Sequence, residues 1–380
     1  MRAQGADGMN ALGFFTLGWT VMAGGFSAVA LARLYRRAPV TVGGPLPSVL
    51  LLRPVDAPTP LELENLAHRI DYAGPLEQVV LSPYRPRLAE GVRWLPSDPV
   101  CPNRKVGHLL YALETLDVRG RVVLAVDADV AVTGALVEGL ASPLVAGAAL
   151  STAAPTPVGA MDAAGRAMAG LLRYTHHSFR ALHAMSAGAQ AVCGKALGLS
   201  PRAAEELVGL SDHIGEDLEL AKRLHARGLD VALSPAPAWV PVANGTSWRV
   251  PLERFTRWMQ VLASHRPGLY PTVPLLFTPT VPLLLLAAWL HEPAVWLAVA
   301  ALVAVRTLLS LRLAALSRVP SEVDRGHALT DWMQGELLLL AAFAASLTRQ
   351  GRVTWRGHTY ALEAGGRMVR VASQWSGGPG

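Results

Sequence analysis

Two aspartates one residue apart follow an apolar run. Residues 124–132 read LAVDADVAV, so Asp127 and Asp129 come where a buried strand would end. Two carboxylates in one place can hold a divalent cation, and the cation can hold the two phosphates of a nucleoside diphosphate. Aspartate is also common where a turn begins. The pair alone therefore leaves a cation site and an ordinary turn both open.

A second acidic pair, Glu216 and Asp217, follows Gly215 and opens the stretch EDLELAKRLHARG. The apolar spacing of this stretch predicts a helix over residues 216–228 that closes at a glycine. Acidic residues in a first turn often cap the helix or match its dipole. A carboxylate there can equally act as a general base that takes a proton from an acceptor hydroxyl.

A third group lies in ERFTRWMQ, residues 253–260, where Arg254, Arg257 and Trp258 fall on adjacent turns of one predicted helix. Next to a membrane, arginine can reach lipid phosphates and tryptophan favours the interface. The same side chains can also close a pocket that holds a phosphate. Both interpretations remain open for the group taken alone.

The composition indicates a membrane protein with a soluble part. Apolar residues make up 51% of the chain, charged residues make up 16%, and the mean hydropathy is +0.31. The net charge of +6 comes without basic runs interleaved with aromatics, so nucleic acid is not an expected partner, and the arginines near apolar segments fit anionic lipid better. Cys101 and Cys193 form neither a disulfide framework nor a metal-ligand spacing, which favours a reducing compartment.

Residues 11–32 carry no charge and are long enough to span a bilayer. Arg33, Arg36 and Arg37 follow, so the positive-inside rule places the N-terminus outside and the following residues in the cytoplasm. A cleaved signal peptide is disfavoured because its apolar run is shorter and its basic flank lies on the other side.

Further spans are predicted near the other end, at residues 273–290 and 294–311, joined by a short turn at residues 291–293. Arg306 lies inside the last of these and is expected to face a partner helix or the inner interface. Residues 337–347 predict either a fourth span or a re-entrant helix, and the arginines of the tail favour the re-entrant form with a cytoplasmic C-terminus.

Between the membrane segments, short apolar runs alternate with helical periods. Strands are predicted at residues 48–53, 77–82 and 121–127, a strand followed by a loop at 231–237, and helices at 61–70, 105–116 and 216–228. This order predicts a parallel or mixed sheet with helices on both faces. Such sheets bind ligands at the carboxyl ends of their strands, where Asp127 and Asp129 lie.

The three groups, in this order and ending against a membrane segment, resemble the membrane-bound inverting glycosyltransferases of the ceramide glucosyltransferase type, which include hopanoid-associated enzymes. The resemblance covers most of the chain. Its further motifs are LLRPVDAPTPLELENL (51–66), NRKVGHL (103–109), VCGKALGLSPRA (192–203) and VTWRGHTYAL (353–362).

The resemblance implies an α/β fold with a GT-A-type nucleotide-sugar-binding domain and a mixed sheet, flanked by transmembrane helices. It implies transfer in one inverting displacement, without a covalent sugar–enzyme intermediate. The expected partners are a nucleotide-sugar donor, a lipid acceptor such as ceramide, a hopanoid or diacylglycerol, and a bacterial-type inner membrane with the catalytic domain in the cytoplasm. The expected parts are an anchor at 1–40, a glycosyltransferase domain at 46–266, membrane or re-entrant helices at 270–350 and a basic cytoplasmic tail at 351–380.

The resemblance also implies roles for the groups described above. Asp127 and Asp129 would hold Mg²⁺ or Mn²⁺ and the diphosphate of a UDP-sugar, and Asp217 would deprotonate a lipid hydroxyl with Glu216 beside it. The remaining implied residues contact the leaving diphosphate, the acceptor opening or the nucleotide: Arg254, Arg257, Trp258, Asn103 and Lys105.

One expected acid is missing. Family members carry an acidic residue after the second strand, in a stretch like Gln-Asp-His-Asp-Asp-Pro, that helps to hold the nucleotide base. Here LSPYRPRLAEGVRW (81–94) has no acid between Leu81 and Ala89, and Arg85 and Arg87 stand there instead. Three interpretations stay open: another group contacts the base, the donor is a different nucleotide sugar or a polyprenyl-phosphate sugar, or the chain is a catalytically silent relative that binds a nucleotide or lipid.

A histidine metal site and a transporter function are both disfavoured by the sequence. Residues 171–185 predict an amphipathic helix with His176, His177 and His183, but adjacent histidines point to different faces, which favours a surface or acceptor-groove role over a metal site. A transporter is disfavoured because three or four segments around a large soluble part are too few for most transporter folds.

Overall fold

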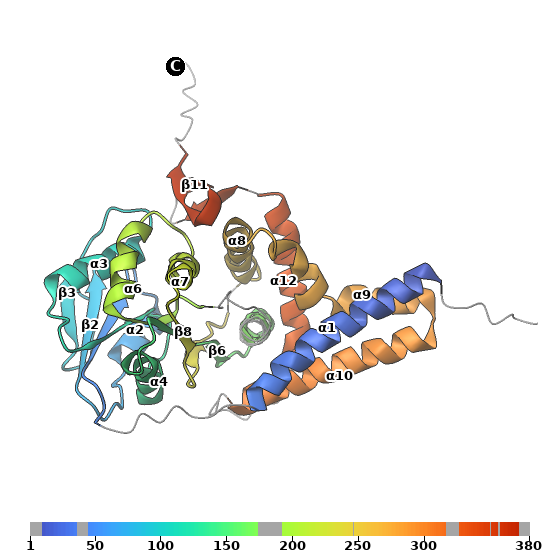
Figure 1. The fold of residues 1–380 in the computed structure, drawn as a ribbon, viewed down its shortest axis with the longest axis horizontal. Helices are drawn as coiled ribbons and strands as arrows, with labels where there is room; N and C mark the ends of the chain where they lie inside the picture. Colours follow the sequence, from blue (N-terminus) through green and yellow to red (C-terminus); the bar gives the residue numbers. More distant parts are fainter. Residues whose placement is uncertain are drawn as a thin grey trace, which may run out of the picture.

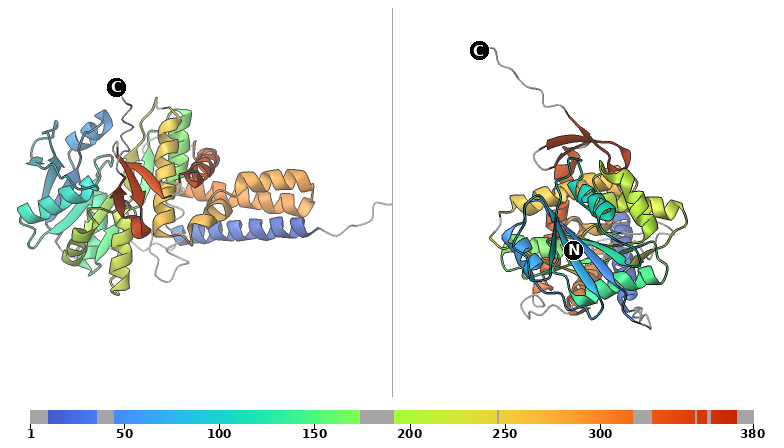
Figure 2. Two further views of the ribbon diagram at one scale, coloured as in Figure 1. Left: turned by 90° about the horizontal axis from the view of Figure 1, so that it is seen from above. Right: turned by 90° about the vertical axis from the view of Figure 1, so that its left-hand side faces the viewer.

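The computed structural model describes residues 10–35, 45–173, 192–245, 247–316, 327–349, 351–355 and 358–371. An α/β part forms one end of the molecule, and a group of long helices projects from it (Figures 1 and 2). The basic residues Arg36 and Arg37 and the histidines at 176, 177 and 183 lie outside the described residues.

A seven-stranded mixed sheet forms the centre of the α/β part, in the order β3-β2-β1-β4-β7-β5-β8. The first four of these are parallel, whereas β7 runs antiparallel to both β4 and β5. The predicted mixed sheet is therefore confirmed. The strand bounds are β1 Val49–Pro54, β2 Leu76–Ser82, β3 Arg93–Pro96, β4 Val122–Val126, β5 Leu150–Thr152, β7 Ala196–Leu199 and β8 Val231–Leu233.

Helices cover both faces of the sheet, as the uninterrupted apolar run of β1 predicts. Val49 and Leu51 pack in a core with α4, whereas Leu50 and Leu52 pack in a second core with α3 and α7. Side chains alternate in direction along a strand, so one apolar run fills two cores. The helix bounds are α2 Pro60–Ala67, α3 Arg104–Thr115, α4 Gly134–Val145, α6 Pro201–Leu207, α7 Glu216–Ala226 and α8 Arg249–His265.

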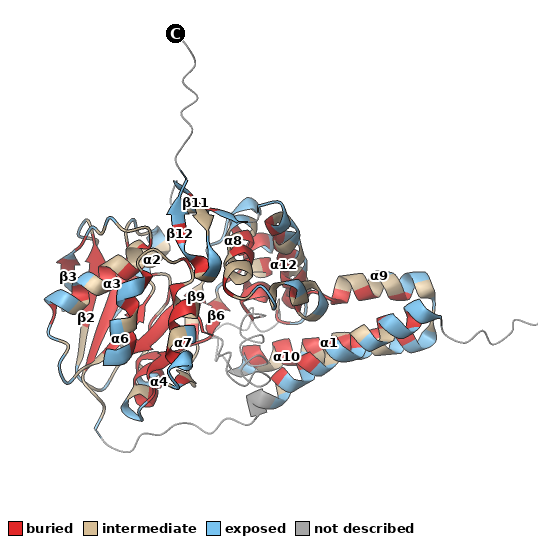
Figure 3. Cartoon of the chain, turned by 45° about the horizontal axis from the view of Figure 1, so that its top comes forward, coloured by how far each residue is buried: buried red, intermediate tan, exposed pale blue. Residues whose placement is uncertain are grey.

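The projecting helices are α1 (Ala11–Tyr35), α9 (Thr280–Leu290) and α10 (Pro293–Leu316). Two stretches, Ala11–Ala32 and Pro293–Ala315, are long and apolar enough to cross a membrane. Large apolar side chains on these helices face outward, such as Phe14, Leu285 and Leu297, and Figure 3 shows their outer faces exposed. Outward apolar faces of this extent are typical of helices that contact lipid.

The predicted second span is bent rather than straight. Residues Tyr270–Phe277 and Thr280–Leu290 meet at an angle of 59°, and the first piece ends in a π-helical turn, η3 (Val273–Phe277). Arg306 of α10 caps this break, since it donates to the backbone carbonyl of Leu276 (2.7 Å) and pairs with Glu336. The expectation that Arg306 faces a partner helix is therefore confirmed.

Glu336 belongs to α12 (Asp331–Leu347), which includes the stretch expected to be a fourth span or a re-entrant helix. Among the described residues, α12 is not one of the helices long and apolar enough to cross a membrane, and the bent segment is 270–290 instead. α12 packs along α8 and lies across the base of the projecting helices (Figure 1). Its first turn carries the buried Asp331, which pairs with Arg166 (3.0 Å) and Arg173 (3.3 Å).

Two small sheets complete the described structure. Strands β6 (Pro155–Val158) and β9 (Ala238–Pro241) pair in parallel. In the C-terminal tail, β10 (Arg352–Trp355), β11 (His358–Leu362) and β12 (Met368–Arg370) form an antiparallel sheet. The sequence pattern did not predict these tail strands.

Candidate active site

The acidic turn after β4 is held from below by a buried arginine. Arg53, in β1, is fully buried and donates to the backbone carbonyls of Asp127 (3.1 Å) and Val130 (2.8 Å), and to that of Ala128. Asn65 of α2 also donates to the Ala128 carbonyl (3.1 Å). Because its carbonyls are fixed from inside, the turn presents both carboxylates at the carboxyl edge of the sheet.

Each of the two aspartates faces a lysine. Lys105, in the first turn of α3, lies 2.8 Å from Asp127, and Lys195, just before β7, pairs with Asp129. Arg254 approaches Asp129 as well, at 3.4 Å. Burial alone would raise the pKa of Asp129, but Lys195, Arg254 and Lys105 hold that pKa down at about 2. Asp129 is therefore ionised at any physiological pH.

The carboxylate oxygens at this turn suit a divalent cation that also binds a phosphate. The Oδ1 atom of Asp129 is buried and has no hydrogen-bond partner within the described part of the chain. Across those same residues, no three His, Cys, Asp or Glu side chains converge to hold a metal by themselves. Mg²⁺ commonly takes one or two carboxylates and completes its shell with water and substrate phosphates. Asp127 and Asp129 fit that mode.

The second acidic pair faces the first across the same space. Glu216 accepts a hydrogen bond from Asn103 Nδ2 (3.0 Å) and lies 3.2 Å from Lys105. Asn103 is the N-cap of α3, and its Nδ2 also donates to the backbone carbonyl of His213 (2.7 Å). Lys105 therefore joins both acidic groups, and Asn103 ties the start of α3 to the turn before α7.

Asp217 accepts a hydrogen bond from the backbone N–H of Gly194 at 2.5 Å. A Cβ at position 194 would lie 3.2 Å from the Asp217 carboxylate and 3.3 Å from Lys105 Nζ, so only glycine allows this approach without displacing either group. Burial first, and the charge of Glu216 second, raise the pKa of Asp217 to about 7, against the opposing charge of Lys105. A carboxylate with that pKa can accept a proton near neutral pH.

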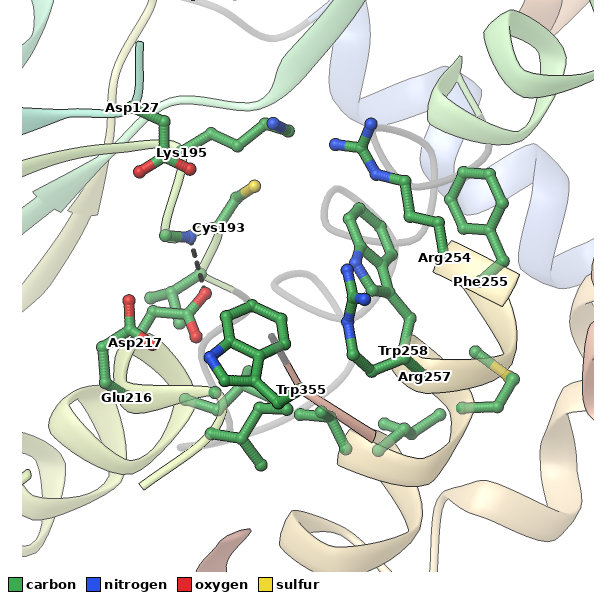
Figure 4. Close-up of a pocket in the computed structure, with 18 of the residues that line it drawn as sticks. Asp127, Cys193, Lys195, Glu216, Asp217, Arg254, Phe255, Arg257, Trp258 and Trp355 are labelled. Carbon is green, nitrogen blue, oxygen red and sulfur yellow. Dashed lines mark hydrogen bonds between the residues drawn. The ribbon is translucent and has the colours of Figure 1, made fainter. Parts of the chain in front are cut away.

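The α8 helix supplies the opposite wall. Arg254 reaches toward Asp129, and Trp258 packs edge-on against Phe255 at 5.1 Å between ring centroids. Arg257 lies over the ring of Trp355 from the tail, 4.6 Å from its centroid. Figure 4 shows these side chains facing Asp127, Glu216 and Asp217 across one cavity.

The cavity has a volume of about 980 Å³, and all nine residues singled out in the sequence line it. The aspartates, lysines and arginines described above line it. Apolar side chains line it as well, including Leu262 of α8, Leu339 of α12, and Val273 and Phe277 of η3. Phe277 packs edge-on against Phe26 of α1, with 5.1 Å between the centroids. The cavity therefore extends from the acidic turn to η3, which packs against a helix apolar enough to cross a membrane.

Three lining or supporting residues were not predicted from the sequence: Arg53, Lys195 as a partner of Asp129, and Trp355. Arg53 leaves a signal in the sequence, since it is a lone charge in a strand that is otherwise apolar. Lys195 and Trp355 leave none that points to Asp129 or Arg257, because these contacts join segments 66 and 98 residues apart.

The turn after β2, where an acid was expected, is occupied by its own hydrogen bonds. Ser82 donates to the backbone carbonyl of Tyr84 (2.7 Å) and accepts from Trp94 Nε1 (3.1 Å). The neighbouring strand β1 is followed by Asp56, which accepts from Arg104 (2.8 Å) and faces His108 (2.9 Å). Asp56 thus offers a carboxylate at the same edge of the sheet.

The mixed α/β sheet thus carries paired carboxylates at its carboxyl edge, and basic side chains line the same cavity. Comparison with known families matches residues 92–368 to glycosyl transferase family 21. This match covers most of the chain, and the chain belongs to that family, the family of the ceramide glucosyltransferases. The resemblance seen in the sequence motifs is thereby confirmed.

Among solved structures, the chain is similar to the mannosyltransferase PcManGT from Pyrobaculum calidifontis in complex with GDP-Man and Mn²⁺. The two share 15% identity with a TM-score of 0.46, over 88% of this chain and 99% of that one. A likeness of that size carries no information about donor or metal. No curated protein sequence matches the chain.

Proposed function

We propose that this glycosyltransferase transfers a sugar from a nucleotide sugar, of the UDP-hexose class, to the hydroxyl of a membrane lipid. The observation that carries the proposal is the mixed lining of the cavity. Asp127, Asp129 and Asp217 line it together with Val273 and Phe277, which belong to the candidate bent span at 270–290. An acyl chain suits the apolar part of this lining, and a hydroxyl attached to that chain would then lie in the same cavity as the carboxylates.

In the proposed reaction, Asp217 takes the proton of the lipid hydroxyl as the hydroxyl oxygen forms a bond to the anomeric carbon. The bond from that carbon to the diphosphate oxygen breaks in the same step. The attack comes from the face opposite the leaving group, so the configuration inverts. The pKa of about 7 for Asp217 supports this role, because the carboxylate is available near neutral pH and is basic enough to accept a proton.

The leaving nucleoside diphosphate carries concentrated negative charge, and four cationic side chains line the cavity near it: Lys105, Lys195, Arg254 and Arg257. When bound, Mg²⁺ or Mn²⁺ would be held by Asp127 and Asp129 and would supply Lewis-acid stabilisation of the diphosphate. Lys105 and Lys195 would then be free to turn from the aspartates toward the phosphates.

The placement in the cell is part of the proposal. The basic residues after the first span favour a cytoplasmic active site on a bacterial-type inner membrane. The cytoplasm also supplies nucleotide sugars.

The experiment is a titration of the detergent-purified protein with UDP, with and without Mn²⁺, by calorimetry. Wild type is compared with Asp127→Ala/Asp129→Ala and with Asp230→Asn, a control at an exposed position outside the cavity. We expect Mn²⁺-dependent binding in wild type and the control, and its loss in the double variant. Binding of GDP but not UDP would overturn the donor assignment. Absence of binding to any nucleoside diphosphate would favour a polyprenyl-phosphate sugar donor or a silent relative that binds lipid.

A further inference from the structure

The C-terminal sheet of β10, β11 and β12 forms part of the cavity wall, although the proposed reaction assigns it no role. Trp355 at the end of β10 and Met368 at the start of β12 both line the cavity. In Figure 4 the Trp355 ring lies between Asp217 on one side and Arg257 with Trp258 on the other. The tail therefore contributes an aromatic side chain to the cavity wall, in contact with Arg257.

The sheet is fixed to α8 at its first strand. Gln260, on the buried side of α8, donates its side-chain amide to the backbone carbonyls of Arg349 (2.8 Å) and Arg352. Both carbonyls lie within a few residues of Trp355. Because Arg257 and Gln260 are three residues apart on the same helix, one helix face holds the strand and carries the arginine.

The last part of the sheet is fixed to the turn that precedes Asp217. The N–H of Ile214 donates to the carbonyl of Gly366 (2.9 Å), and the N–H of Met368 donates to the carbonyl of Asp212 (2.7 Å). Gly366 has a φ of +78°, and a Cβ there would come within 2.2 Å of His265 Nε2. Only glycine fits, so the tail meets the start of α7 at a defined position.

The guanidinium of Arg257 packs over the face of the Trp355 indole. Its carbon lies 4.6 Å from the centroid of the indole, within the range of a cation–π contact. Burial, and then the neighbouring charge of Arg254, lower the pKa of Arg257 to about 10, so the group remains a cation at neutral pH. A guanidinium that lies over a ring keeps its N–H groups at the edge, where they can donate to an anion in the cavity.

We propose that Trp355 is a positioning residue, delivered by the C-terminal sheet, that fixes the guanidinium of Arg257 toward the diphosphate of the donor. This inference rests on the proposed function for the identity of the anion. It gives the tail a role in the reaction through Arg257, without contact of Trp355 with the reacting atoms.

The test is a double-mutant cycle on the full-length protein, with kcat/KM for sugar transfer as the readout. The variants are Trp355→Leu, Arg257→Leu and the double variant, with Thr354→Leu as a matched control on the exposed side of the same strand. We expect Trp355→Leu to lose about 30-fold, the size of a desolvated cation–π contact. The double variant should lose no more than Arg257→Leu alone, and the control should stay near wild type.

Two independent losses that multiply in the double variant would overturn the inference, since Trp355 would then act without Arg257. If Trp355→Leu does not fold, Trp355→Phe keeps an aromatic face and should lose less than about 5-fold, and a full loss there would also overturn it. If wild type transfers no sugar, the proposed function fails separately. The same cycle is then measured on the dissociation constant for inorganic pyrophosphate, where multiplicative losses would again refute the positioning role.

Discussion

Replacing Asp217 by Asn should reduce sugar transfer while it stabilises the fold. Asn keeps the oxygen that accepts the Gly194 N–H but cannot take a proton. General-base catalysis contributes about 100-fold or more, so we expect at least that loss in transfer. In wild type, kcat/KM should rise with pH and level off above about 7, because only ionised Asp217 is a base.

The same substitution should stabilise the fold, and the gain should depend on pH. The pKa of Asp217 is raised from an ordinary 3.8 to about 7, so the native state holds this proton more tightly than the unfolded chain does. Wild-type stability from this group therefore falls as pH rises from about 4 and stops falling above about 7. At 1.36 kcal/mol for each pH unit, the advantage of Asn should grow by about 3 kcal/mol between pH 4.5 and 7.5.

The assay is thermal unfolding of wild type and Asp217→Asn in the same detergent, across that pH range, with Asp230→Asn as the control. The difference in midpoint should increase by several degrees toward neutral pH and then stay constant. A difference that does not change with pH would show that Asp217 is not held with a raised pKa. Unchanged transfer by the variant would refute its role as the base.

Further predictions concern groups that support the site. Arg53→Met should weaken Mn²⁺-dependent nucleotide binding by at least about 10-fold in calorimetry while leaving both aspartates in place, because the turn loses its buried donor. Arg306→Met should lower the free energy of unfolding by about 3–5 kcal/mol, because it leaves Glu336 buried without its cation. Thermal unfolding should show a lower midpoint for Arg306→Met, and adding Glu336→Gln should partly restore it. Equal midpoints for the single and the double variant would contradict this. Asp56→Asn should reduce the ratio of UDP to GDP affinity if this carboxylate replaces the missing acid, and an unchanged ratio would remove it from base recognition.

Much of the site is local in sequence, and that part could be predicted. Asp127 follows an apolar strand, and Asp217 opens an amphipathic helix, so each signals its place within about ten residues. That Asp127 and Asp129 lie at a ligand site follows from the rule that parallel strands present ligand sites at their carboxyl ends.

The parts that could not be predicted depend on contacts between distant segments. Lys195 pairs with Asp129 because β7 lies antiparallel beside β4. The two strands are far apart in the sequence, so no hairpin turn between them predicts the pairing. The apolar stretch of α12 has the composition of a membrane helix, yet it packs along α8, because its length and its buried Asp331 and Glu336 suit an intramolecular contact. The tail strands are short and half-exposed, so their pattern carries little periodic signal.

Asp217 is the proposed base for sugar transfer to a lipid hydroxyl. The most direct measurement is transfer of labelled sugar from UDP-glucose and other nucleotide sugars to vesicles containing ceramide, a hopanoid or diacylglycerol, with the product anomer assigned by NMR. We expect a glycolipid of inverted configuration from wild type and Asp230→Asn, and none from Asp217→Asn. A product of retained configuration, or equal product from Asp217→Asn, would contradict it.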